Sequence, residues 1–258
     1  MKRYIILPIF ALVVFVSAIS EIDPVFKKVS NDLKSMELHG KVRKVTEITI
    51  VGKVIGRKDQ AGDTLYKYIY SFNDYGYLIN TISYDNNIKL NWRSIYEYDS
   101  NGFKTVVIQY KLDSTLHSKH FFVYHTDDTC IEERTYDSTG KFACKNFTYY
   151  DSIGNVKKSQ FYFMSLLDPY IYNYSDSGRR VDIKNTPSRY SNKVHYIKRY
   201  NFRGELVMEA TIVNGKLDSQ YSYSHIYDAE GNWVIRYQTQ KSDTLYTQYR
   251  KIEYYGLQ

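Results

Sequence analysis

The sequence predicts an all-β protein, an elongated, curled antiparallel meander of about 14 to 16 short strands with one short N-terminal helix. Two observations carry this prediction. A motif of an aromatic residue, an Asp or Asn and a following Gly recurs in repeats of about 26 residues. Between its copies, aromatic and β-branched residues alternate with polar ones, as they do along strands. We therefore expect a single β-repeat domain over residues 41–258.

The recurring motif has the chemistry of a tight turn. An Asp or Asn side chain can accept a hydrogen bond from the backbone two residues on, and Gly adopts the positive φ that ends a type I turn with a bulge. Weaker turn signals lie about midway between the copies, so each unit of about 26 residues predicts two strands joined as hairpins. The copies occupy residues 72–76, 98–102, 150–154, 174–178, 200–204 and 227–231, with a degraded copy at 124–128.

The first residues have the pattern of an exported protein. Lys2 and Arg3 precede an apolar run and then small residues, which predicts a signal peptide over residues 1–20. The apolar run is too short for a comfortable membrane span, so we expect no stable span in the mature chain. The expected location is the periplasm or the cell surface.

A short amphipathic helix is predicted over residues 21–40. Asp23 and Pro24 can cap and begin it, apolar residues such as Leu33 and Met36 recur at helical spacing, and Gly40 ends it. We expect this helix to cover one open end of the sheet.

Neither the net charge nor any catalytic motif indicates a specific function. The formal net charge is +7, of which Lys2 and Arg3 supply two, and an exported, modestly basic protein is not expected to bind nucleic acid. The adjacent Glu132 and Glu133 face apart on a strand, and no serine has a nucleophile-elbow context. A non-enzymatic protein without a cofactor is therefore expected, and the oligomeric state stays open.

Histidines and cysteines do not make a convincing site either. His120 and His125 point to opposite faces of a strand, and with His117 they lack a completing carboxylate, so no metal site is expected. Cys130 and Cys144 flank a predicted hairpin turn about three residues out of step, which disfavours a disulfide.

Aromatic residues at alternate positions form a ladder on one face of the predicted sheet. Its rings either form a core or face a ligand, and both interpretations stay open. Charges on the opposite face disfavour a lipid-facing wall; the residues expected there are Lys67, Arg93, Glu97, Lys104, Glu132, Arg134, Lys198 and Arg236. The candidate binding residues of the ladder are Tyr68, Tyr70, Trp92, Tyr96, Tyr98, Tyr170, Tyr172, Tyr174, Tyr196, Tyr221 and Tyr223.

The hexapeptides at residues 150–155 and 227–232 resemble the tyrosine-aspartate repeat of the rearrangement-hotspot (Rhs) and wall-associated proteins. Together with the Gly-Lys-Val at residues 40–42, the chain also resembles small secreted bacterial proteins built from such degenerate repeats. The resemblance implies a β-repeat strip used for surface contact or carbohydrate binding. About eight units of longer spacing are too few for the closed toxin shell of the large Rhs proteins, so that function is not implied.

The leading hypothesis is an exported, non-enzymatic repeat protein whose tyrosine-lined sheet contacts a glycan or an envelope partner protein. A cell-envelope hydrolase on a β scaffold is one alternative, and it requires clustered carboxylates in a cleft. An outer-membrane β-barrel is the other alternative, because about fifteen or sixteen strands is a porin-like number.

Overall fold

The structure is a computed structural model that describes residues 32–52, 61–127, 129–163, 165–166, 169–175, 177, 179–185, 192–241 and 243–256. The predicted signal peptide and the first part of the predicted helix lie outside these residues. The elements in chain order are α2 (Asp32–Ser35), β1 (Val42–Val51), β2 (Thr64–Phe72), β3 (Leu78–Tyr84), β4 (Leu90–Tyr98), β5 (Lys104–Lys111), β6 (Leu116–His125), β7 (Cys130–Asp137), β8 (Phe142–Tyr150), β9 (Val156–Phe163), β10 (Ser165–Leu166), β11 (Tyr170–Ser175), β12 (Arg180–Asn185), β13 (Val194–Tyr200), β14 (Leu206–Val213), β15 (Lys216–Tyr227), β16 (Trp233–Gln240) and β17 (Asp243–Tyr254).

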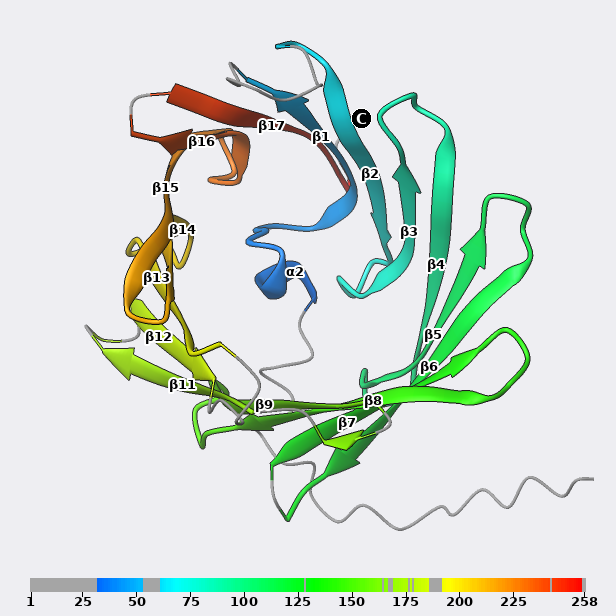
Figure 1. The fold of residues 1–258 in the computed structure, drawn as a ribbon. Coiled ribbons are helices and arrows are strands. Elements are labelled where there is room, and N and C mark those ends of the chain that lie inside the picture. The colour runs from blue at the N-terminus through cyan, green and yellow to red at the C-terminus, as the bar shows by residue number, and fades with distance from the viewer. Residues whose placement is uncertain are drawn as a thin grey trace, which may run out of the picture.

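The strands form one closed antiparallel barrel (Figure 1). Each strand pairs with the next along the chain, β11 follows β9 in the ring, and the two-residue β10 pairs with β9. Closure comes from β1, which pairs with β2 on one edge and with β17 on the other, from Val42–Tyr254 to Val51–Tyr246. Among the described strands, the ring without β10 has 16. The predicted antiparallel order and strand number are confirmed, but the predicted elongated meander is wrong because its two ends join.

The turns at one end of the barrel have the predicted chemistry. In the β8–β9 turn, Asp151 Oδ1 accepts hydrogen bonds from the backbone N–H groups of Ile153 and Asn155, at 3.0 and 2.8 Å. Gly154 follows with φ +90° and donates its N–H to the Asp151 carbonyl oxygen. The same pattern recurs at Asp99 in the β4–β5 turn. We call this end, where β1 begins, the turn end.

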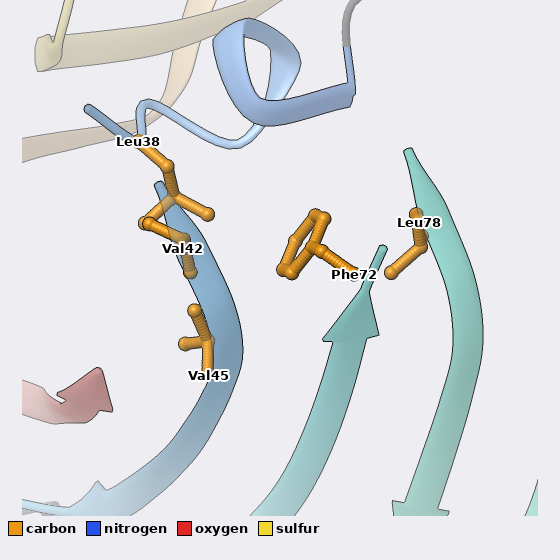
Figure 2. Packing of buried hydrophobic residues seen from close by; sticks show 5 residues of the cluster. All are labelled: Leu38, Val42, Val45, Phe72 and Leu78. Carbon is orange, nitrogen blue, oxygen red and sulfur yellow. The ribbon is translucent and has the colours of Figure 1, made fainter. Parts of the chain in front are cut away.

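The segment that enters the barrel from the N-terminal side lies inside it (Figure 1). Helix α2 has one turn, and residues 36–41 then lead to β1 along the inner wall. Its apolar side chains join the main buried cluster, which Figure 2 shows as Leu38, Val42, Val45, Phe72 and Leu78. The sequence predicts this helix as a cover over an open sheet end. Since the sheet closes, the described part of it acts as a plug inside the ring, and we call residues 32–41 the plug.

The barrel wall has an inner and an outer face that alternate along every strand. Val45 packs in the cluster under the plug and pairs with Tyr70, so Tyr66, Tyr68 and Tyr70 point inward while Lys67 points outward. Because paired residues on neighbouring strands lie on the same face, the register assigns an inner and an outer face to every strand of the ring. It also corrects part of the charge assignment: Lys104, Lys198 and Arg236 point inward.

The reasons for this correction are local. Lys198 lies two residues from both Tyr196 and Tyr200 on β13, so it shares their face. Lys104 pairs with Tyr98 across a bulge, which shifts the alternation by one residue. The two cysteines lie on opposite faces, because Cys130 pairs with Tyr149 and Cys144 with Thr135, and both are free.

Candidate functional site in the barrel interior

The register places all the candidate aromatic residues on the inner wall, but in separate sectors. Tyr68, Tyr70, Trp92, Tyr96 and Tyr98 lie on β2 and β4. Tyr170, Tyr172, Tyr174 and Tyr196 lie on β11 and β13, and Tyr221 and Tyr223 lie on β15. The ladder therefore surrounds the interior instead of forming one flat platform.

The rings on β2 and β4 form a packed wall. Tyr68 stacks on Tyr70 with ring centroids 5.9 Å apart and contacts Trp92 at 6.2 Å. Tyr70 and Tyr96 pack against the hydrophobic cluster under the plug. Burial raises the pKa of both phenols, which keeps their hydroxyls protonated. In this sector Tyr70 and Tyr96 therefore belong to the core.

At three turns of the turn end, the tyrosine that precedes the turn has a structural role. Its hydroxyl reaches the carbonyl oxygen of a residue near the start of an earlier strand: Tyr98 to Leu78 at 2.8 Å, and Tyr174 to Val156 at 2.9 Å. Tyr124 makes the equivalent bond at 3.0 Å. These bonds tie three of the repeats to the repeat before them, so Tyr98 and Tyr174 stabilise the fold whether or not they bind a ligand.

Asp32 anchors the first turn of the plug. It is only 7% exposed, and its Oδ2 accepts hydrogen bonds from Leu78 N–H at 3.1 Å and Tyr98 Oη at 2.6 Å. Its Oδ1 forms an ion pair with Lys104 Nζ at 3.0 Å. Three groups from β3, β4 and β5 therefore hold one buried carboxylate.

A second anchor holds the end of the plug through Trp233, which is 0% exposed. The Arg250 guanidinium lies 3.4 Å from the Trp233 ring centroid and donates hydrogen bonds to Glu47 Oε2 and to the Met36 carbonyl oxygen. Trp233 Nε1 donates to Glu37 Oε2 at 2.8 Å. A cation on an aromatic face away from water contributes about 2 kcal/mol.

A wall side chain also forms hydrogen bonds with the backbone of the plug. Asn232 Oδ1 accepts a hydrogen bond from His39 N–H at 2.6 Å, and its Nδ2 donates to the His39 carbonyl oxygen at 3.1 Å. Sequence reasoning treats Asn232 as part of a turn and misses Asp32, Trp233 and Arg250. Their signal is a polar contact to a distant segment, 46 to 72 residues away for Asp32 and about 200 residues away for the others, and no local pattern contains it.

The sector at β11–β13 is different, because its inner wall borders a cavity of about 600 Å³. Tyr172, Tyr174 and Tyr200 line it together with Val181, Ile183 and Lys198. At its mouth, on the turn end, Phe202 is 84% exposed. We call this space the β11–β13 cavity. Of the predicted candidate binding residues, only Tyr172 and Tyr174 are among the described residues that line it.

Two smaller cavities lie elsewhere. One, of about 230 Å³, lies between Asp32 of the plug and wall residues that include Glu133. Its two carboxylates have partners, because Glu133 binds His120 Nδ1 at 2.8 Å and Asp32 is held by Leu78, Tyr98 and Lys104. The other, of about 430 Å³, includes Trp92 and His117. Within the described ranges there is no group of three or more His, Cys, Asp or Glu placed to hold a metal ion.

The outer face carries many charges. Glu132 is buried there between Arg134 and His125, with Oε2 at 2.9 and 3.0 Å from their nitrogen atoms. Hydrogen bonds from the Arg134 guanidinium, and to a smaller extent from His125, lower the pKa of Glu132 to about 2. A second cluster joins Asp182 to Arg180 and His195. In the described residues, no helix is long and apolar enough to cross a membrane.

No protein-family model matches the chain, and no curated protein sequence matches it. Solved structures do. A porin-like protein from Bacteroides uniformis aligns with 82% of this chain and 98% of its own, at 11% identity and a TM-score of 0.55.

Two structures of TcdB2–TccC3 also align with this chain. The one with Cdc42 has a TM-score of 0.28 over 12% of its own chain, and the other has a TM-score of 0.19 over 15% of its own chain. Such scores carry no argument, so the resemblance to the tyrosine-aspartate repeat stays unconfirmed. Because the porin-like neighbour is only 11% identical to this chain, the likeness shows a shared barrel fold and nothing about function.

Proposed function

We propose that this protein is an exported, non-enzymatic barrel of the bacterial envelope that binds a saccharide in the β11–β13 cavity. The observation that carries the proposal is the cavity wall itself, where three tyrosine rings face about 600 Å³ of open space. Ligand pockets typically span about 300–1,000 Å³. Flat aromatic faces suit the apolar faces of sugar rings, while the phenol hydroxyls suit polar edges.

The hydroxyls of two rings are held, which fixes the rings before a ligand arrives. Tyr174 Oη donates to the Val156 carbonyl oxygen, and Tyr172 Oη lies 3.3 Å from Ser159 Oγ. Binding to fixed groups loses less conformational entropy than binding to mobile ones. The plug makes its hydrogen bonds to other sectors, so it leaves these rings available to a ligand.

A binding screen tests this proposal. The mature protein is applied to a glycan array, and the affinity for each hit is measured by calorimetry. Tyr172→Ala should weaken binding by about tenfold or more, as expected for the loss of roughly 1.4 kcal/mol. Tyr249→Ala is the matched control, because Tyr249 lies on the outer face and is 40% exposed. Equal affinity of the folded Tyr172→Ala variant would reject this cavity as the site.

A porin-like outer-membrane barrel is the second candidate. It is favoured by the closed ring of 16 described strands and by the porin-like structural neighbour. The outer face weighs against it, since Lys67, Arg93, Glu97 and the Glu132 cluster point outward. Each charge at the middle of a bilayer costs about 2–4 kcal/mol for Arg or Lys.

Fractionation separates the two candidates. A lipid-embedded barrel stays with the membrane after alkaline carbonate washing and needs detergent for extraction. The proposed binding protein leaves with the wash and stays monodisperse without detergent. We do not propose the envelope hydrolase, because none of the described residues that line the β11–β13 cavity is a carboxylate.

A further inference from the structure

The β11–β13 cavity contains a lysine that forms no ion pair with a carboxylate of the described residues. Lys198 points inward between Tyr196 and Tyr200 on β13 and lines the cavity. Its neighbour on β12 is Val181, which is buried and apolar. Among the described residues, no carboxylate oxygen forms an ion pair with its ammonium group.

The acidic residue nearest in register makes its hydrogen bond to another strand. Glu209 lies opposite Lys198 on β14, and its carboxylate accepts a hydrogen bond from the Tyr223 hydroxyl on β15. None of the described residues that line the cavity is acidic. The cavity therefore offers the Lys198 ammonium group beside aromatic faces.

Charge and rings together define a ligand class. A carboxylate is the natural partner of a lysine ammonium in a partly enclosed site, where a charge-assisted bond is stronger than in water. The tyrosine faces and the exposed Phe202 at the mouth suit a flat or chair-shaped ring. We infer that the cavity selects an acidic saccharide, with a uronic acid carboxylate on Lys198 and the sugar ring against Tyr172 and Tyr200.

This inference rests on the proposed function and adds the charge of the ligand to it. It is tested by calorimetry at low salt with two probes of the same size, digalacturonate and the neutral galactobiose. The wild-type mature protein should bind digalacturonate at least about tenfold more tightly than galactobiose, and 0.5 M NaCl should reduce only the affinity for the acid.

Variants of one residue decide the point. Lys198→Gln should abolish the preference and leave the affinity for galactobiose unchanged, and Lys198→Arg should retain it. Lys67→Gln, a lysine of the outer face, is the control and should behave as wild type. A preference that survives in Lys198→Gln, or equal wild-type affinity for both probes, overturns the inference while the saccharide site stands. No binding to either probe or to any glycan of the array overturns the proposed function as well.

Discussion

Removing the Asp32 carboxylate should release the plug from the wall. In Asp32→Ala, Leu78 N–H loses its acceptor, and Lys104 loses the ion pair at 3.0 Å. The Tyr98 hydroxyl keeps an alternative in the Leu78 carbonyl oxygen. Hydrogen bonds to a charged group contribute about 1.5–3 kcal/mol each, and Lys104 remains partly hydrated. The net loss is therefore about 2–4 kcal/mol of plug attachment.

Hydrogen exchange measures this loss directly. The Leu38 N–H donates to the Leu33 carbonyl oxygen within the plug, so its exchange reports plug opening. A change of about 2–4 kcal/mol predicts exchange faster by roughly 30- to 700-fold. Amides in the middle of the β6–β7 pair should keep their protection, because the barrel stays closed.

The control is Asp113→Ala, which removes an exposed turn carboxylate at the end of the barrel away from the plug. It should leave Leu38 exchange unchanged. If Asp32→Ala also leaves that rate within about twofold of wild type, the buried carboxylate does not hold the plug. A uniform loss of protection over all strands would instead show that plug and barrel unfold as one unit.

Three further predictions concern stability. Arg250→Met should destabilise the barrel by about 3–5 kcal/mol because it leaves Glu47 buried and unpaired; in urea, the double variant with Glu47→Leu should recover part of the loss, and no recovery would refute the pairing. Gly102→Ala should lower the thermal midpoint further than Gly140→Ala, since both glycines have φ +83° but only at Gly102 would a Cβ collide with a neighbouring side chain, the Tyr77 hydroxyl; equal midpoints would contradict this. The folded state lowers the pKa of Glu132 from its ordinary value of 4.5 to about 2. This carboxylate therefore contributes stability that is present above pH 4.5 and is lost as the pH falls towards 2, and Glu132→Gln should flatten the acid limb of the stability profile in that window.

Local chemistry made the strands and turns predictable. An Asp or Asn followed by a Gly, as at Asp151 and Gly154, sets the turn by short-range hydrogen bonds that any sequence window contains. Alternation likewise placed Tyr170, Tyr172 and Tyr174 on one face. Both features depend on neighbours a few residues apart, so the antiparallel order and the approximate strand number followed.

Closure and the plug depend on long-range contacts and were not predictable. Nothing in the composition of β1 shows that both its edges are paired, and the pairing of Val45 with Ile252 spans most of the chain. Which tyrosines are core and which border a cavity follows from closure. Tyr70 and Tyr172 have similar local sequence surroundings, yet only Tyr70 lies under the plug.

The double pairing of β1 also constrains how the chain can fold. Until β17 has been synthesised and aligned, one edge of β1 presents unpaired N–H and C=O groups, to which another chain can pair. Contacts between the first and last strands also give a high contact order, which slows folding. The almost complete barrel must therefore be shielded from other chains for the time its final strand takes to arrive, and a chain cut short before Asp243 should aggregate instead of remaining as a stable partial barrel.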